Sequence, residues 1–313
     1  MQLITILGQT SSGKSDMAIE LCEYIRSIGK KACIVGCDSR QIYKGLNIGT
    51  GKVEGKWVYD QTLNRDIFKY KYVAHFMIDF VDPKLDYNLQ NYISDFYDLM
   101  LAIEDYFDFV ILVGGTGFYA NAITQKLNLG SVKPEFLSQY EDYKSNLQGK
   151  PIHTLQDSTD NLLVKLNNSD YNNKIRLVSN LLKAHCQDNN WLDDSIYYEF
   201  EKQYTFAISI VQNVLKNKIE TRLKQRFDQG LIAEVKEFEY LGQNKFILLG
   251  LEYRQAWFYN KGDINLEELK QNLLIENLQY AKRQLTWLKQ QKNLIWIRNL
   301  DEMLEQLKIQ STF

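Results

Sequence analysis

Residues 8–15 read Gly-Gln-Thr-Ser-Ser-Gly-Lys-Ser and directly follow the apolar run Leu3–Leu7. A glycine followed five residues later by Gly-Lys-Ser, between an expected strand and an expected helix, is typical of a phosphate-binding loop. Its backbone N–H groups can turn toward phosphate oxygens, and the helix N-terminus adds partial positive charge. A plain Gly-Ser turn is the alternative. The expected phosphate-binding residues are Gly8, Gln9, Thr10, Ser11, Ser12, Gly13, Lys14 and Ser15.

Two of these side chains would act directly on a diphosphate or triphosphate. Lys14 supplies a full positive charge, and the Ser15 hydroxyl can bind a Mg²⁺ ion that bridges phosphate oxygens. Asp38 stands where the next expected strand ends and is a candidate proton acceptor. It could also form an Asx turn or cap a helix, and such a structural role does not exclude the chemical one.

A glycine pair, Gly114-Gly115, follows a third expected strand. Glycines at a strand end permit close approach of a ligand, but a tight strand-to-helix turn would explain them as well. In parallel sheets, ligands bind beyond the carboxyl ends of the strands. The loop at 8–15, Asp38-Ser39 and Gly114–Thr116 should therefore converge on one place.

The elements that position these residues follow from the apolar pattern. Helical spacing predicts a helix over 14–28 that ends at Gly29. Alternation of strands with helices predicts an α/β fold, in which a parallel sheet has helices on both faces. The expected strands of this sheet are 3–7, 31–36, 109–113 and 205–211, and a further short apolar segment at 294–297 ends a helix-rich stretch.

Two segments depart from this alternation. Residues 55–75 alternate polar and apolar side chains, which indicates a β-hairpin or extended excursion. Residues 134–201 are polar and rich in Asn and Tyr, with helical stretches, and indicate an inserted helical lobe. Residues 1–133 and 202–313 would then form the core, whose C-terminal part is rich in helices.

Composition sets limits on the function. The 313 residues, 45% of them apolar, suit two domains or one domain with an insertion. A net charge of −2 gives no overall attraction to nucleic acid. Four scattered cysteines indicate neither a disulfide framework nor zinc. The N-terminus has no signal-peptide pattern and no run reaches membrane length, so we expect a cytoplasmic protein.

Basic residues nevertheless gather in two C-terminal stretches. Lys218, Arg222 and Arg226 would share one face of a helix that an apolar stripe anchors. A second stretch, 280–292, carries Lys282 and Arg283 and no acidic residue. Either run alone would be an ordinary solvated face, but together they indicate a surface for an anionic macromolecule.

In this order, the motifs resemble those of the tRNA dimethylallyltransferase family, whose members are also called tRNA isopentenyltransferases. Besides residues 8–15, the resemblance rests on 38–52, on His75–Asp79 with Asp82-Pro83, and on 113–119. C-terminal motifs also carry it, namely Arg222, 230–235, 250–255 and 281–288. The resemblance implies a P-loop NTPase-like fold and covers most of the chain.

The resemblance implies transfer of a dimethylallyl group from dimethylallyl diphosphate to N6 of the adenosine on the 3′ side of a tRNA anticodon. Lys14, Arg222 and Mg²⁺ on Ser15 would neutralise the departing diphosphate. Asp38 would accept the proton of the amine, and Thr116 would position the base or a phosphate oxygen.

The expected RNA contacts also follow from the resemblance, since RNA is read where single-stranded bases can be splayed out. Asn173 stands where the family usually has an arginine, and the 55–73 excursion is longer than usual, with no assigned role. The residues expected to contact the tRNA are Asp38, Ser39, Arg40, Gln41, Thr116, Asn172, Asn173, Lys174, Ile175, Arg176, Lys282 and Arg283.

Two other functions fit parts of the pattern. A small-molecule or nucleoside kinase would use the same loop and sheet, but such kinases typically need an arginine-rich lid, and the lobe has few arginines. The third possibility is a non-catalytic RNA-binding protein that a nucleotide switches. We expect a monomer, since nothing in the sequence demands a larger assembly.

Overall fold

The structure is a computed structural model that describes residues 1–115, 117–126, 132–161, 166, 168–192 and 198–308. It divides into two compact units. The first comprises Met1–Tyr87, Asp98–Thr124 and Glu199–Phe313, and the second Asn88–Tyr97 and Gln125–Tyr198. The predicted lobe at 134–201 overlaps the second unit, and its role in holding RNA stays a prediction.

The first unit is built on an eight-stranded sheet with the order β3-β4-β5-β2-β6-β1-β7-β8. From β5 to β8 all neighbouring strands are parallel, and β3 and β4 extend the sheet in antiparallel pairing. The strands are β1 (Gln2–Leu7), β2 (Ala32–Gly36), β3 (Lys56–Asp60), β4 (Arg65–Tyr70), β5 (Val73–Phe76), β6 (Phe109–Val113), β7 (Gln203–Ile208) and β8 (Ile295–Ile297).

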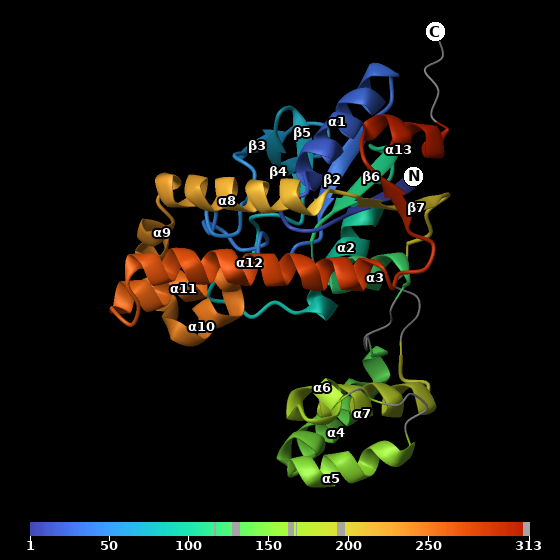
Figure 1. The fold of residues 1–313 in the computed structure, drawn as a ribbon. Coiled ribbons are helices and arrows are strands. Elements are labelled where there is room, and N and C mark those ends of the chain that lie inside the picture. Colours follow the sequence, from blue (N-terminus) through green and yellow to red (C-terminus); the bar gives the residue numbers. More distant parts are fainter. Residues whose placement is uncertain (116, 127–131, 162–165, 167, 193–197, 309–313) are drawn as a thin grey trace. The chain divides into compact units, whose positions relative to one another are not determined.

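The helices surround this sheet and fill the C-terminal part of the chain (Figure 1). In the first unit they are α1 (Lys14–Ser27), α3 (Gly117–Thr124), α8 (Gln212–Gln229), α9 (Leu231–Glu237), α10 (Gly242–Leu249), α11 (Leu251–Lys261), α12 (Leu266–Leu288) and α13 (Leu300–Leu307). Helix α2 (Leu89–Ile103) has residues in both units. Short 3₁₀ helices are η1 (Pro134–Phe136), η2 (Ser158–Asn161) and η3 (Glu239–Leu241).

Helix α1 packs on the sheet through the stripe that its spacing predicts. Met17, Leu21 and Ile25 are buried in one cluster with residues of β1, β6 and β7 and of α13. In Figure 1, α1 and α13 lie next to each other. The helix ends as expected, because Gly29 has a φ of 76° and donates its N–H to the Arg26 carbonyl.

The sheet confirms the predicted α/β architecture and corrects its details. The expected hairpin at 55–75 forms strands β3 and β4 followed by β5, so the sheet is mixed rather than wholly parallel. Strand β7 ends at Ile208, earlier than predicted, because α8 already begins at Gln212. Across the residues that the structure describes, no helix combines the length and hydropathy of a membrane span.

The second unit is helical and has a small core of its own. Its helices are α4 (Leu137–Gly149), α5 (Ile152–Asp157), α6 (Asn168–Tyr171) and α7 (Lys174–Asp188). Leu147 of α4, Leu155 of α5 and Leu177 of α7 meet in one buried cluster. An asparagine sets the start of α7, since the Asn173 side chain accepts the N–H of Arg176.

Candidate active site

The loop between β1 and α1 has the backbone of an anion cradle. Ser11 and Gly13 have φ values of 59° and 95°, which turn the chain back at the start of α1. Helix α1 begins without a side-chain cap, so the N–H groups of its first turn are not satisfied by a capping residue. Such a helix N-terminus attracts an anion. The loop thus has a backbone suited to an anion, and phosphate binding by residues 8–15 stays a prediction.

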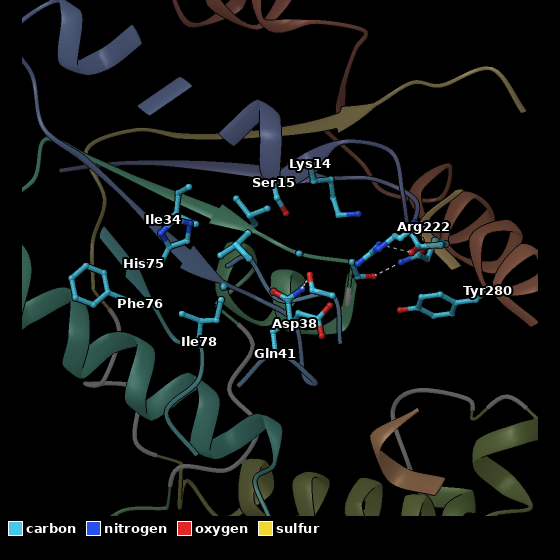
Figure 2. A pocket seen from close by; sticks show the side chains of 18 residues that line it. Lys14, Ser15, Ile34, Asp38, Gln41, His75, Phe76, Ile78, Arg222 and Tyr280 are labelled. Atoms are coloured by element: carbon cyan, nitrogen blue, oxygen red, sulfur yellow. Dashed lines mark hydrogen bonds between the residues drawn. The ribbon is translucent and has the colours of Figure 1, made fainter. Parts of the chain in front are cut away.

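Lys14 lies across this loop and points into the pocket (Figure 2). Its Nζ donates to the carbonyl oxygens of Gly8, at 3.1 Å, and Gln9, at 2.7 Å. Burial and the nearby Arg222 charge lower the pKa of Lys14 to about 8, against the opposing effect of Asp38. The ammonium therefore stands in surroundings that favour binding of a negative charge.

Arg222 of α8 supplies a second cation to the same pocket. It donates to the Thr10 hydroxyl at 3.3 Å, and burial together with the charge of Arg226 lowers its pKa to about 10. Arg226 itself is buried and forms an ion pair with Glu252. Among the described residues, no ion pair involves Lys14 or Arg222. These two cations are therefore left for a ligand.

The prediction that Lys218, Arg222 and Arg226 form a basic surface on α8 is wrong in part. Lys218 is exposed, but Arg222 turns into the pocket and Arg226 is only 6% exposed. The reason is that Arg226 is neutralised by Glu252, which the linear charge count could not include. The exposed basic side chains of α8 are therefore lysines, while Arg222 and Arg226 do not belong to a surface for an anionic macromolecule.

Asp38 lies in the pocket, two residues after the end of β2. Its Oδ1 accepts the N–H of Arg40 at 2.8 Å, so the Asx turn considered as an alternative does form. The carboxylate still lines the pocket together with Gln41. Ser39 and Arg40 are not among the residues that line it. Thr116, predicted to position a substrate, lies outside the described residues.

The pocket has a charged end and an apolar end. Figure 2 shows Ile34, His75, Phe76 and Ile78 on one side and Arg222 and Tyr280 on the other. The full set of lining residues is Thr10, Lys14, Ser15, Ile34, Gly36, Asp38, Gln41, Gly51, Val53, His75, Phe76, Ile78, Val113, Gly114, Gly115, Arg222, Tyr280 and Gln284. Such a cavity suits a ligand that joins a polyanion to a short hydrocarbon chain.

The glycine pair after β6 allows this convergence of strand ends. A Cβ at Gly114 would lie 2.3 Å from the Cys37 carbonyl oxygen, so only glycine lets the ends of β6 and β2 approach so closely. A Cβ at Gly115 would lie 2.8 Å from Nε2 of Gln284. The tight turn is thus confirmed. Both glycines also line the pocket, and close approach of a ligand to them stays a prediction.

Helix α12 holds the phosphate loop through residues that the sequence analysis did not single out. Gln284 accepts the N–H of Thr10 at 2.7 Å and donates to the Gly115 carbonyl at 2.9 Å. Gln9 donates to the Ala281 carbonyl at 2.9 Å. Burial and the charge of Asp38 raise the pKa of Tyr280 to about 12. The only sequence signal for Gln284 and Tyr280 was their place in or beside the 281–288 motif.

The residues predicted to contact tRNA lie in both units. In the first unit, Lys282 and Arg283 are exposed on α12 and border a groove with Trp287. In the second unit, Asn172, Lys174 and Ile175 are exposed beside Asn173. Arg176 forms an ion pair with Asp170 at 2.9 Å. Asn173 thus has a structural function as the N-cap of α7, and any contact with RNA stays a prediction.

The residues that could hold a metal ion are few. Within the described part of the chain, no cluster of three or more His, Cys, Asp or Glu side chains has the arrangement of a metal site. Ser15 is exposed beside the phosphate loop, and Asp38 lies in the same pocket. Magnesium usually binds to one or two protein oxygens together with phosphate oxygens and water. The Ser15 hydroxyl and the Asp38 carboxylate are suitable ligands of this kind.

The fold and the site define a protein with a phosphate-loop fold, in which two cations and a carboxylate share one pocket. Residues 41–291 match the family model "IPP transferase", and the chain belongs to that family. It is a transferase.

Curated relatives agree with this family. The tRNA dimethylallyltransferase 1 of Syntrophus aciditrophicus is 32% identical over 315 aligned positions, which cover 98% of this chain and 97% of the relative. The tRNA dimethylallyltransferase 2 of Shewanella sediminis is 32% identical over 91% of this chain and 88% of its own length.

Solved structures share the fold. The full-length tRNA isopentenylpyrophosphate transferase of Bacillus halodurans matches 98% of this chain and 94% of its own, with a TM-score of 0.64 and 23% identity. A eukaryotic dimethylallyltransferase, described as acting on tRNA, has a TM-score of 0.69 at 20% identity and matches 98% of this chain and 77% of its own.

Proposed function

We propose that this chain transfers a dimethylallyl group from dimethylallyl diphosphate to the exocyclic N6 of the adenosine on the 3′ side of a tRNA anticodon. One observation carries the proposal. Lys14 and Arg222, two cations in no ion pair among the described residues, share a pocket with the carboxylate of Asp38. That arrangement supports loss of an anionic leaving group from one substrate and loss of a proton from the other.

The charged end of the pocket would serve the leaving group. As the bond between the allylic carbon and the diphosphate oxygen breaks, negative charge grows on that oxygen, and Lys14 and Arg222 would stabilise it. The Ser15 hydroxyl would hold Mg²⁺ together with phosphate oxygens, and the ion would supply further charge neutralisation. The apolar side chains of Ile34, Phe76 and Ile78 would receive the hydrocarbon.

The other end of the reaction is the base. The N6 lone pair of adenine is delocalised into the ring, so the amine is a poor nucleophile until its proton is taken. As the new bond between N6 and the allylic carbon forms, Asp38 would accept that proton, a contribution of about 10²- to 10⁴-fold. We assign Thr116 to positioning the base or a phosphate oxygen.

The tRNA would present this adenosine as an extruded base of the anticodon loop. We assign its recognition to Asp38–Gln41, to Asn172–Arg176 of the second unit and to Lys282 and Arg283 of α12. The proposal includes a monomeric enzyme that acts in the cytoplasm.

Radiolabelled dimethylallyl diphosphate with unmodified tRNA tests the proposal. We expect label to enter the tRNA in the presence of Mg²⁺, and no label in a control tRNA whose target adenosine is replaced. Parallel assays with γ-labelled ATP and nucleosides test the kinase alternative. ATP-dependent phosphorylation of a small molecule without transfer to tRNA would contradict the proposal.

A further inference from the structure

A buried glutamate holds the loop that brings Gly51 to one wall of the pocket. Glu234 of α9 is 7% exposed, and its carboxylate accepts three successive backbone N–H groups of the segment 46–52, here called the wall loop. The distances are 2.8 Å from Asn47, 2.8 Å from Ile48 and 2.9 Å from Gly49. The Tyr253 hydroxyl donates to the same carboxylate at 2.6 Å. Four donors therefore converge on one acceptor.

The wall loop in turn determines what faces the pocket. The Gln41 side chain, which lines the pocket, donates to the carbonyls of Thr50 and Gly51 at 3.3 and 3.2 Å. A Cβ on Gly51 would lie 2.0 Å from Nη2 of Arg222, so the loop backbone lies directly against that guanidinium. A shift of the loop would therefore move both Gln41 and Arg222.

The far end of the wall loop has a separate anchor. Lys52 donates to the Asp79 carboxylate at 2.5 Å and to the Tyr43 carbonyl at 2.7 Å. Glu234 thus attaches 47–49 from outside the loop, while the carbonyls of Asn47 and Ile48 accept the N–H groups of Lys52 and Gly51 within it. Loss of the carboxylate would therefore loosen the half of the loop that precedes Gly51. A carboxylate suits this attachment because it only accepts hydrogen bonds, whereas a carboxamide would turn an NH₂ group toward some of these donors.

We propose that Glu234 is a positioning residue for the transfer reaction, because it fixes the wall loop and through it the place of Arg222 against the diphosphate. This inference rests on the proposed function for the identity of the reaction, whereas the effect of Glu234 on pyrophosphate binding does not depend on it. Glu234 itself touches neither substrate in this account. Displacement by even about 1 Å of a group that contacts the reacting atoms can cost about 10²-fold in rate.

The test compares Glu234→Gln with Tyr253→Phe. Tyr253→Phe removes one hydrogen bond from the carboxylate and leaves the three from the wall loop. Glu234→Gln replaces one carboxylate oxygen by NH₂ and so loses at least one backbone N–H donor of the wall loop. We expect Glu234→Gln to weaken pyrophosphate binding about tenfold or more, measured by calorimetry, and to lower kcat in the same proportion. Tyr253→Phe should stay within about twofold of the original protein in both. Equal pyrophosphate affinity and kcat in the two variants would overturn the proposal.

Thermal unfolding of both variants separates positioning from reduced stability, since comparable Tm values with different affinities exclude a purely structural role. If Glu234→Gln does not fold, Glu234→Asp takes its place, since it keeps a carboxylate that only accepts hydrogen bonds but sets it back by one methylene. The same fall in pyrophosphate affinity is expected, and unchanged affinity would overturn the proposal. Gly51→Ala separately tests the contact between the loop and Arg222, because its methyl group would meet Nη2 of Arg222. Because pyrophosphate binding needs no transfer, failure of the original protein to modify tRNA would count against the proposed function and not against this inference.

Discussion

The surroundings of Lys14 and Arg222 disfavour the positively charged forms of both side chains. Burial lowers the pKa of both side chains, and each lies near another cation. A diphosphate would remove that repulsion and restore their ordinary affinity for protons. At the scale of single residues, the two neighbouring cations therefore favour the binding of a polyanion.

The first prediction concerns pH. Lys14 must be protonated to bind an anion, and its pKa in the empty pocket is about 8. Pyrophosphate affinity should therefore fall as pH rises through 8, by roughly tenfold per unit at higher pH. Lys14→Met is the comparison, because it lacks the ammonium. Pyrophosphate itself titrates in this pH range, and this affects its binding to both proteins alike. Calorimetry from pH 6.5 to 9.5 should show the affinity ratio of the two proteins converging toward one, and a constant ratio would contradict this.

The second prediction concerns the proton acceptor. Asp38→Asn keeps an oxygen for the N–H of Arg40 and so preserves the turn, but the amide cannot accept the proton of N6. We expect kcat to fall by about 10²- to 10⁴-fold in single-turnover assays, with pyrophosphate affinity largely kept. A fall in affinity equal to the fall in kcat would show that the carboxylate serves the diphosphate instead.

At the scale of elements, two C-terminal helices complete a site that begins at the N-terminus. Helix α8 brings Arg222 to Thr10, and α12 brings Gln284 to the same loop. The phosphate loop is thus one continuous segment of the sequence, but the residues that hold it in place come from distant segments. The same holds for the wall loop, which Glu234 fixes from α9.

The third prediction tests the support from α12. Gln284→Ala leaves the Thr10 N–H and the Gly115 carbonyl without their partner, at a cost of about 1–3 kcal/mol in the free energy of unfolding for each group that stays buried. Pyrophosphate affinity should fall with it, because the loop loses its attachment. Gln271→Ala, an exposed position on the same helix, is the matched control and should change neither quantity. Denaturant unfolding and calorimetry measure the two effects, and undiminished affinity in Gln284→Ala would contradict the argument.

The difference between local and distant contacts explains what the sequence could predict. The loop at 8–15, the strand that ends before Asp38 and the helix that ends at Gly29 each follow from neighbouring residues, and the structure confirms these elements. The attachments by Gln284 and Glu234 join residues 274 and 185 positions apart, so no local pattern indicates them. The burial of Arg226 escaped prediction for the same reason, since its partner Glu252 lies on another helix.

At the scale of the whole molecule, a net charge of −2 must be reconciled with an RNA substrate. The structure removes Arg222 and Arg226 from the candidate basic surface, which leaves α12 as the exposed basic segment of the first unit that the resemblance names. Lys282 and Arg283 are both exposed there, and Arg283 lies over the Tyr280 ring at 5.8 Å. Because Tyr280 also lines the pocket, this surface is continuous with the site.

The fourth prediction therefore concerns the salt dependence of tRNA binding. Replacing Lys282 and Arg283 together with alanine should weaken tRNA binding and make the slope of log affinity against log salt shallower, by about 0.7 to 0.9 for each phosphate that the protein no longer neutralises. The KM for dimethylallyl diphosphate should stay unchanged, because neither side chain lines the pocket. The control replaces Lys30 and Lys31 with alanine, which removes the same formal charge just before β2, at the opposite ends of the strands. Filter binding at several salt concentrations distinguishes the two pairs, and equal slopes for both would mean that α12 does not hold the RNA.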